Sequence, residues 1–531
     1  MLTLQSLIVG PVGACERTSS LGRLHCIVPQ HEVREGCWLS LVFLACLLAV
    51  CWLYVCMVTF NDREDVNWKG FTILKKWVNW FMVAIIIFAV LTFYYALLLV
   101  FALFQIALKE PLELHCVHQV FLLMGVLFVA LAVAAFTHGW PGEWPTVAVS
   151  LQATGPFLQM GAVVALTLLS WFVIQRVHKA RRVGSKILLS LVFSIIVIAV
   201  YLSPLLIRCH TPCLSDDIPP KPELIGHRGA PMLAPENTMM SFERSVACNV
   251  TAFETDVQIS GDGVPFLMHD HDDFFLRTTD AKHKFAGRDF NKSGKLTLEE
   301  LQDLNAGDWF LKTDPFYTVS QLSPEEKEMA TNQTVPSLVQ LLDLAQKNNI
   351  SILFDLKNEN GTNDTNIVVE TILMSGIDPR LIFWLPPTQR SDVKKSAPGF
   401  KQYYNNISDM KKEGGTSLNL KYNSLNTYEL RKLDEENITV NLWVVNESWL
   451  FSLLWCTGVS SVTTNSCHRF QKMTQPDWTL GPTQYTAIWI TVDLLSLLIM
   501  SGLIYKSLLV QRKKKNRVTV SNGHELNPFL P

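Results

Sequence analysis

The stretch Leu224-Ile225-Gly226-His227-Arg228-Gly229 opens the part of the chain that decides the fold. It has the pattern of a short strand that ends in polar groups, and Phe253-Glu254-Thr255-Asp256-Val257 repeats that pattern. Side chains two apart on a strand share a face, so Glu254 and Asp256 are expected to project together. Two carboxylates on one face repel each other unless a cation lies between them. The two strands therefore predict a charged site at a strand end.

Two later stretches add groups of the same kind. Phe266-Leu267-Met268-His269-Asp270 brings a second histidine, and Ile352-Leu353-Phe354-Asp355-Leu356-Lys357 puts Asp355 and Lys357 on one face. Three carboxylates, two histidines, an arginine and a lysine at strand ends are typical of a metal-assisted site for a phosphorylated substrate. Carboxylate oxygens suit Mg²⁺ or Ca²⁺ better than zinc, and a histidine can pass a proton near neutral pH.

The composition indicates a membrane protein. The 531 residues are 49% hydrophobic, and a formal net charge of −2 gives no reason to expect nucleic acid as a partner. Six apolar stretches are close to or above the roughly 20 residues that span a bilayer. They are Trp38–Phe60, Phe81–Leu108, Gln119–Phe136, Ala153–Ile174, Lys186–Ile207 and Tyr485–Val510, of which the third is the shortest. The sequence predicts a multi-pass α-helical membrane protein with six spans.

The segment between the fifth and sixth spans has ordinary globular composition. It alternates strand-like runs with helical patterns such as Ser337–Lys347 and Thr427–Glu435, which predicts a parallel α/β domain of the (β/α)₈ TIM-barrel type. No cleaved signal peptide is expected in residues 1–36, so the first span is expected to serve as a signal anchor. The predicted organisation is a cytoplasmic segment 1–37, five spans in 38–207, a linker 208–221, the barrel in 222–480, the sixth span 485–510 and a basic tail 511–531.

Basic loops predict the orientation, because such loops stay in the cytoplasm. Arg176, Lys179, Arg181, Arg182 and Lys186 follow the fourth span, and Arg512, Lys513, Lys514, Lys515 and Arg517 follow the sixth. Two spans separate these segments, so both lie on the same side of the membrane. The barrel is therefore expected on the other side, and both termini are expected in the cytoplasm. The basic loop between the first two spans, with Arg63, Lys69, Lys75 and Lys76, favours the opposite orientation but is outnumbered.

Glycosylation motifs favour the same orientation. The Asn-x-Ser/Thr triplets all fall in the predicted barrel, at Asn249, Asn291, Asn332, Asn349, Asn360, Asn363, Asn406, Asn437 and Asn446. The alternative is a domain that is merely rich in these residues. The preferred interpretation is an extracellular or lumenal barrel with several glycans, in the plasma membrane or the secretory pathway.

Cysteines give weaker information. Cys209 and Cys213 flank a short loop and are expected to be able to form a disulfide. With Cys248, Cys456 and Cys467 they make five cysteines on the predicted outer side of the membrane, an odd number that leaves at least one thiol unpaired. Cys15, Cys26 and Cys37 precede the first span, where free thiols are preferred over palmitoylation.

An ordered set of motifs resembles the glycerophosphodiester phosphodiesterase family. Its first four motifs are His227-Arg228-Gly229-Ala230, Pro235-Glu236-Asn237-Thr238, Glu254-x-Asp256-Val257 and Met268-His269-Asp270. Two later stretches look like the family's seventh and eighth barrel strands, Asn441-Leu442-Trp443-Val444-Val445-Asn446 and Gly458–Asn465. The resemblance covers about residues 222–470, and the flanking spans make the chain similar to the six-transmembrane branch of that family.

The resemblance implies roles for single residues. Glu254, Asp256 and the third-strand acid, here Asp355, are implied ligands of one divalent cation, Mg²⁺ or Ca²⁺, and His227 and His269 are the implied acid/base pair. Arg228 and Lys357 are suited to bind the phosphate. Many soluble members have Glu where this chain has Asp355, and the shorter arm favours a larger ion or a bridging water. The nucleophile is either the substrate's glycerol 2-hydroxyl or a water.

Several residues allow two interpretations. Glu236 and Asn237 either belong to the site or cap the following helix, and Trp443 either contacts substrate or fills the barrel. Asp270 is a candidate to orient a neighbour. The stretch from Asp289 to Glu300 fits the EF-hand loop pattern, but a convincing incoming helix is missing, so Ca²⁺ binding there is not favoured.

The motifs together predict a metal-dependent hydrolase of glycerophosphodiesters at the outer membrane face. Its products would be an alcohol head group and a glycerol phosphate or its cyclic form. Candidate substrates are glycerophosphocholine, glycerophosphoinositol and the glycosylphosphatidylinositol anchors of surface proteins. The alternatives are an inactive barrel that acts in signalling, and a transporter, for which Asp493 and the Gly155-Pro156 break are the main intramembrane features.

Overall fold

The computed structural model describes residues 14–15, 26–27, 30–74, 76–108, 112, 114–180, 182–270, 275–288, 292–357 and 363–524. Within these ranges, the side chains of residues 14–15, 26–27, 30–37, 208–209, 275–276 and 514–524 lie outside the described set, so the thiols of Cys15, Cys26, Cys37 and Cys209 are not assigned partners. The chain divides into two compact units, Met1–Val147 and Ala148–Pro531.

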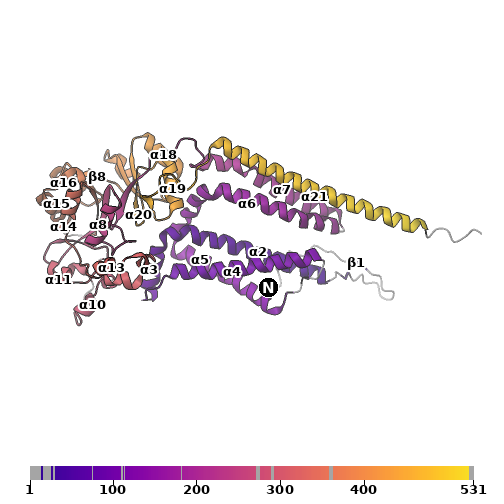
Figure 1. Cartoon of the computed structure of the whole chain (residues 1–531), viewed down its shortest axis with the longest axis horizontal. Coiled ribbons are helices and arrows are strands. Elements are labelled where there is room, and N and C mark those ends of the chain that lie inside the picture. Colours follow the sequence, from indigo (N-terminus) through magenta and orange to yellow (C-terminus); the bar gives the residue numbers. More distant parts are fainter. Residues whose placement is uncertain are drawn as a thin grey trace, which may run out of the picture. The chain divides into compact units, whose positions relative to one another are not determined.

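The first unit consists mainly of helices (Figure 1). They are α2 (Gln30–Val58), η1 (Thr59–Asp62), α3 (Arg63–Leu74), α4 (Trp80–Leu108), α5 (Cys116–Gly139) and η2 (Pro141–Glu143), beside a two-residue pairing of β1 (Ala14–Cys15) with β2 (Cys26–Ile27). Tyr95 is buried between Val42 and Leu122, and its hydroxyl donates to the Leu122 carbonyl at 3.2 Å. A Cβ at Gly125 would collide with that hydroxyl, so the glycine lets α4 and α5 pack closely.

The second unit begins within α6 (Trp144–Lys179), continues with α7 (Val183–His210), and has α21 (Pro482–His524) as its last helix. Polar side chains join these helices inside an apolar surrounding. The Trp489 indole donates to Asp493 Oδ2 at 2.7 Å and to the Tyr201 carbonyl at 2.9 Å. Gln159 Nε2 on α6 also donates to Asp493 Oδ1 at 3.5 Å, so Asp493 takes part in hydrogen bonds of the kind that join helices in lipid. Helix α6 also continues through Pro156, where the sequence suggested a break.

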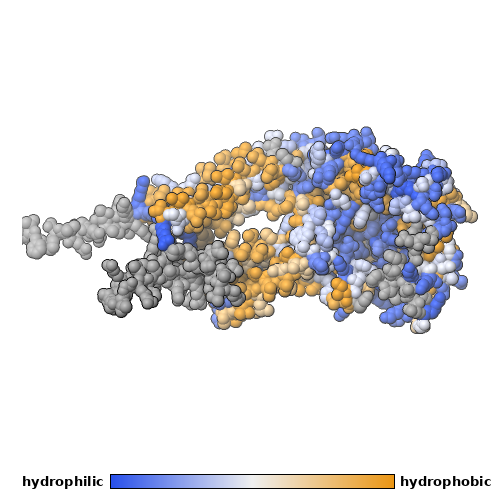
Figure 2. Space-filling model, turned by 180° about the vertical axis from the view of Figure 1, so that it is seen from behind, coloured by the Kyte–Doolittle hydropathy of each residue, from blue (hydrophilic) through white to orange (hydrophobic). Residues whose placement is uncertain are grey.

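In the part of the chain that the structure describes, six helices are long and apolar enough to cross a membrane. They are Trp38–Leu74, Trp80–Leu108, Cys116–Gly139, Pro141–Lys179, Val183–Ile207 and Pro482–Lys513, and each overlaps one of the six predicted spans. The third, predicted as the shortest, is a full 24-residue helix. Hydrophobic side chains cover the outer faces of these helices, whereas the barrel surface is largely hydrophilic (Figure 2).

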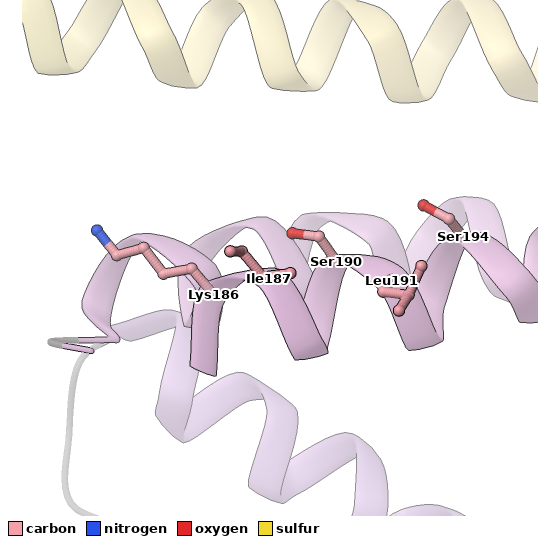
Figure 3. Close-up of a pocket in the computed structure, with 5 residues that line it drawn as sticks. All are labelled: Lys186, Ile187, Ser190, Leu191 and Ser194. Carbon is pink, nitrogen blue, oxygen red and sulfur yellow. The ribbon is translucent and has the colours of Figure 1, made fainter. Parts of the chain in front are cut away.

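A pocket of about 410 Å³ lies along α7, lined by Lys186, Ile187, Ser190, Leu191 and Ser194 (Figure 3). Its lining comes from one face of one helix and contains none of the predicted site residues. It therefore has no part in the chemistry considered below.

Eight parallel strands form a nearly closed barrel. In spatial order they are β8 (Lys401–Gln402), β7 (Ile382–Trp384), β6 (Ser351–Leu356), β4 (Ala252–Ile259), β3 (Glu223–His227), β11 (Ser461–Thr464), β10 (Thr439–Trp443) and β9 (Ser417–Lys421). An isolated parallel bridge between Tyr404 and Leu418 connects the two ends of this order. The short β5 (Pro265–Leu267) pairs antiparallel with β4. This topology confirms the predicted (β/α)₈ class.

Helices cover the outside of the barrel. They are α8 (Met239–Ala247), α14 (Leu338–Asn348), α15 (Asp364–Ser375), α16 (Arg390–Ser396), α17 (Ile407–Lys412), α18 (Thr427–Glu435), α19 (Ser448–Thr457) and α20 (Cys467–Phe470). The predicted helices at 337–347 and 427–435 are α14 and α18, and each begins with a capping box, from Ser337 with Gln340 and from Asn426 with Glu429. The core between strands and helices is strongly apolar, with Phe253, Phe354 and Trp384 fully buried.

An insertion lies between β5 and α14. It contains α9 (Phe275–Thr278), α10 (Ala281–Lys284), η3 (Ser293–Lys295), α11 (Leu298–Gln302), α12 (Asp308–Thr313), η4 (Val319–Gln321) and α13 (Pro324–Thr331). The EF-hand-like pattern falls here, and its first three positions lie outside the described residues. Glu300, its twelfth position, accepts from the Thr297 backbone N–H in a capping box and pairs with Arg288. The Glu300 carboxylate therefore has protein partners of its own.

The disulfides differ from the expected one. Cys213 pairs with Cys456, and Cys248 pairs with Cys467, across 243 and 219 residues of sequence. The predicted Cys209–Cys213 bond is therefore wrong, because the fold brings the start and the end of the barrel together and offers Cys213 a partner on α19.

Candidate active site

The predicted site residues meet where β3, β4 and β6 end. The register pairs His227 with Glu254 and Asp256 with Asp355, so neighbouring strands present their polar ends at the same level. Glu254, Asp256 and Asp355 each offer one carboxylate oxygen, and these oxygens all lie within 4.8 Å of one another. The strand pattern thus brings together the three acids named from the sequence.

Asp256 is the most enclosed of the three, at 1% exposure. Its carboxylate accepts from Asn237 Nδ2 at 3.0 Å and lies 3.1 Å from Lys357 Nζ and 3.3 Å from Arg228 Nε. Burial alone would raise the pKa of Asp256, but His269, Arg228 and Lys357 together hold that pKa below its usual range. Asp256 is therefore ionised and fixed in place.

Glu254 lies in a different environment. Its Oε2 accepts the Arg228 backbone N–H at 2.9 Å and is 3.9 Å from His227 Nε2. Burial, followed by the negative charge of Asp256, raises the pKa of Glu254 well above its usual range. A carboxylate in this position is favoured only when a further positive charge joins the group. The three carboxylates offer oxygen ligands, and the charge of Glu254 is not balanced by the cationic side chains nearby. Such a set of ligands fits a hard divalent cation.

Asp355 and Lys357 form the outer part of the group. Lys357 Nζ is 2.6 Å from Asp355 Oδ2, and the Asp355 side chain is 44% exposed. Burial opposes the charge on Lys357, but Asp256 and Asp355 raise the pKa of this lysine, so it remains protonated. The shorter arm of Asp355, compared with glutamate, still leaves it within the 4.8 Å group.

The two histidines have different partners. His227 Nδ1 bonds Asn465 Oδ1 at 2.7 Å, which assigns the proton to Nδ1 and the lone pair to Nε2. Burial, followed by the charge of Arg228, lowers the pKa of His227 to about 3, so this ring is neutral. His269 Nδ1 bonds Asp270 Oδ1 at 3.0 Å, so the partner of this ring is a carboxylate rather than an amide.

A second ion-pair chain supports Asp270. Arg277 Nη2 lies 3.1 Å from Asp270 Oδ2 and 3.7 Å from Glu236 Oε1, and its guanidinium stacks over Trp309. Burial would raise the pKa of Asp270, but Arg277 and then His269 hold it below its usual range. The insertion therefore holds the carboxylate that orients His269, which gives Asp270 the orienting position expected for it.

The loop after β3 supplies Glu236 and Asn237. Glu236 Oε2 accepts from Arg228 Nη1 at 3.2 Å, and Asn237 Oδ1 accepts from the Thr255 hydroxyl at 3.0 Å. Thr238, rather than either of these residues, caps α8. The capping interpretation is therefore wrong, and both side chains contact members of the charged group.

Trp443 ends β10 and is 38% exposed. It lies two residues beyond Asn441, whose side chain bonds Asn419 and Thr463 inside the barrel at 2.7 and 2.8 Å. Trp443 consequently shares the inward face, at the mouth, which favours a contact surface over core filling.

Two residues of this group were missed from the sequence, Asn465 and Arg277. Asn465 comes directly after the eighth strand and is two residues beyond Thr463, so the two side chains are expected on the same face. This two-residue spacing is the signal that points Asn465 to the barrel mouth. Arg277 follows Asp270 by seven residues through a segment without a clear pattern, so no comparable signal points to it.

The predicted glycosylation sites divide by exposure. Asn249, Asn332, Asn349, Asn363 and Asn437 are exposed, Asn406 is half-buried and Asn446 is buried, while Asn291 and Asn360 lie outside the described residues.

Known proteins are similar to this chain in sequence. Residues 227–381 match the glycerophosphoryl diester phosphodiesterase family. The glycerophosphoinositol inositolphosphodiesterase GDPD2 of Homo sapiens is 42% identical over 502 residues, covering 93% of this chain and 92% of that protein. The glycerophosphodiester phosphodiesterase domain-containing protein 5 of Homo sapiens is 39% identical over 479 residues, covering 88% and 78%.

Among solved structures, the glycerophosphodiester phosphodiesterase from Agrobacterium tumefaciens covers 48% of this chain and 100% of its own, with 18% identity and a TM-score of 0.37. The sequence relatives span nearly the whole chain, including its apolar helices. The chain belongs to the glycerophosphodiester phosphodiesterase family and is a phosphodiesterase that hydrolyses glycerophosphodiesters.

Proposed function

We propose that the chain uses one divalent cation, Mg²⁺ or Ca²⁺, held by Glu254, Asp256 and Asp355, to cleave glycerophosphodiesters outside the cytoplasm. The observation that carries this proposal is the group of three carboxylate oxygens within 4.8 Å, surrounded by two cationic side chains and two histidines. When bound, the cation would offset negative charge on a phosphoryl oxygen.

The protein's own side chains divide the remaining work. Arg228 and Lys357 are placed beside Asp256 to neutralise and orient the substrate phosphate. His227 Nε2, unprotonated because Nδ1 donates to Asn465, accepts the proton of the attacking hydroxyl. His269, supported by Asp270, donates a proton to the leaving oxygen. Glu236 and Asn237 keep Arg228 and Asp256 in position, and Trp443 contacts the substrate.

The membrane assignment extends this proposal. The six apolar helices span the bilayer, the barrel faces the cell exterior or a lumen, and both termini are cytoplasmic, as the basic segments and the sequons indicate. A site attached to the membrane at both ends of the barrel can reach lipid-linked as well as free phosphodiesters. One similar protein is named for glycerophosphoinositol, which makes that compound the first substrate to test. Glycerophosphocholine and glycosylphosphatidylinositol-anchored proteins are the other two.

The experiment uses the full-length protein in detergent or vesicles. Products from glycerophosphoinositol, glycerophosphocholine and an anchored reporter protein are identified by mass spectrometry, with EDTA and with Mg²⁺ or Ca²⁺ added back. We expect a glycerol phosphate or its cyclic form, no turnover in EDTA, and recovery with one of the two ions. Near-normal turnover in EDTA would contradict the metal proposal while leaving the phosphodiesterase assignment intact.

A further inference from the structure

A chain of hydrogen bonds leads from Asn446 to His227 through residues outside the charged group. Asn446 Oδ1 accepts the backbone N–H of Asn465 at 3.0 Å, and Asn465 Oδ1 bonds His227 Nδ1 at 2.7 Å. Asn465 is 1% exposed and Asn446 is 4% exposed, so neither amide exchanges these bonds freely with water. The loop after β10 thereby determines where the end of β11 places its side chain.

Further bonds fix the same corner. The Ser466 hydroxyl donates to the Asn446 carbonyl at 2.9 Å, and the Ser466 backbone N–H donates to Thr464 Oγ1 at 2.8 Å. Both flanking positions of Asn465 are therefore constrained, and its side chain has a defined direction toward His227. A buried amide that loses its hydrogen bonds destabilises the fold, so this arrangement resists alternatives.

Asn446 is also the acceptor position of the sequon Asn446-Glu447-Ser448. A glycan on Asn446 would occupy the side-chain amide of a buried residue whose Oδ1 already accepts from Asn465. The exposed sequon asparagine Asn437 lies in a different environment, at the surface after α18. Burial and hydrogen bonding thus separate Asn446 from the surface sites.

We infer that Asn446 is not a glycan acceptor but a positioning residue, which acts through Asn465 to hold His227 in its reactive tautomer. This inference rests on the proposed role of His227 as proton acceptor. An amide oxygen opposite Nδ1 accepts a hydrogen bond from the Nδ1–H group, which keeps the proton on Nδ1 and leaves the Nε2 lone pair available. A carboxylate at position 465 can also accept from Nδ1, whereas an aliphatic side chain cannot.

Two pairs of substitutions in the full-length protein test the inference. Asn465→Leu and Asn446→Leu remove the acceptors, while Asn465→Asp and Asn446→Asp keep one. We expect kcat to fall about 10–100-fold in Asn465→Leu and about 10-fold in Asn446→Leu, with KM changed little, as for partners that orient a reactive group. Each aspartate variant should restore most of the rate that its leucine counterpart loses.

Ser448→Ala is the matched control, because it destroys the sequon without changing Asn446. We expect it to show wild-type kcat and wild-type gel mobility, whereas Asn437→Gln should remove one glycan. A mobility shift in Ser448→Ala would overturn the inference, and so would wild-type kcat in Asn465→Leu or Asn446→Leu. If a leucine variant fails to reach the cell surface, the aspartate variant and Ser448→Ala still decide.

The outcome separates the inference from the proposed function. A wild-type rate in His227→Ala would remove the proposed catalytic role itself. A large loss in His227→Ala combined with full activity in Asn465→Leu would contradict only the positioning by Asn465 and Asn446.

Discussion

Two groups of three acids satisfy the same distance criterion in the described parts of this chain, and they differ in what surrounds them. Glu254, Asp256 and Asp355 lie at the mouth of the barrel, and Asp62, Asp65 and Glu143 lie in the first unit. In both groups the carboxylate oxygens are within 4.8 Å of one another. Spacing alone would rank them equally as cation sites.

The helical group has an explanation that needs no ion. Asp62, Asp65 and Glu143 each occupy the first turn of a helical segment, in η1, α3 and η2, where negative charge stabilises the exposed backbone N–H groups. Asp65 is exposed to solvent. The barrel acids instead end parallel strands and contact Arg228, Lys357 and Asn237. The difference teaches that the cations and proton carriers around a set of acids, rather than their number, identify a catalytic site.

The largest expected effect separates the two groups directly. Asp256→Asn should lower kcat by about 10³-fold or more, because several kcal/mol of transition-state stabilisation by the cation would be lost. Asp62→Asn, the matched change in the helical group, should leave kcat within about twofold of wild type. Single-turnover cleavage and calorimetric titration with Mg²⁺ and Ca²⁺ measure both consequences. Equal losses in the two variants would remove the distinction.

The next effect tests the proton carriers that only the barrel group is proposed to use. His227→Ala and His269→Ala should each reduce the single-turnover rate by about 10²–10⁴-fold while folding is retained. The double variant should be little worse than either single one, since the two rings act in one reaction. Retention of more than about a tenth of the rate by either single variant would make that histidine structural.

A smaller effect is expected from the support behind His269. Arg277→Gln removes the guanidinium that contacts Asp270 and Glu236, and should lower kcat about 10-fold with little change in KM. Arg288→Gln is the control in the same insertion, because Arg288 is half-exposed and pairs with Glu300. Identical kinetics in the two variants would show that Arg277 does not position the catalytic group.

The smallest effect on activity is expected from removing glycans. The second unit differs from the first in holding all nine sequons. Endoglycosidase treatment should increase gel mobility, and Asn249→Gln, Asn332→Gln, Asn349→Gln and Asn437→Gln should each remove part of that shift. Activity should change less than about twofold, since these side chains are exposed and lie outside the site. No shift, together with barrel epitopes that are hidden in intact cells, would reverse the proposed orientation.

The sequence predicted the parts of the site that depend on local periodicity. Glu254 with Asp256, and Asp355 with Lys357, are two residues apart on strands, so their shared face follows from strand geometry alone. Strands β10 and β11 were instead predicted from the resemblance to the family's seventh and eighth barrel strands. Strands β7 and β8 are only three and two residues long, too short to leave a periodic signal.

Contacts between distant segments were not predictable in this way. The disulfide partners are more than 200 residues apart, so the nearby Cys209 seemed a better partner for Cys213 than Cys456. Asn465 and Asn446 were not recognised as site residues because an uncharged amide gives no electrostatic signal in sequence. Both amides are buried. Asn465 bonds His227, and Asn446 accepts from the Asn465 backbone N–H, contacts that only the closed barrel creates.

The two disulfides have a consequence for how the chain responds to proteases. Cys213–Cys456 and Cys248–Cys467 join the beginning and the end of the barrel polypeptide covalently. A single cut in any loop between residues 249 and 455 would therefore leave the fragments linked, and the nicked protein would separate only on a reducing gel. Release of the barrel from α7 and α21 would require one cut before Cys213 and another after Cys467. Limited proteolysis can thus nick this enzyme without shedding it.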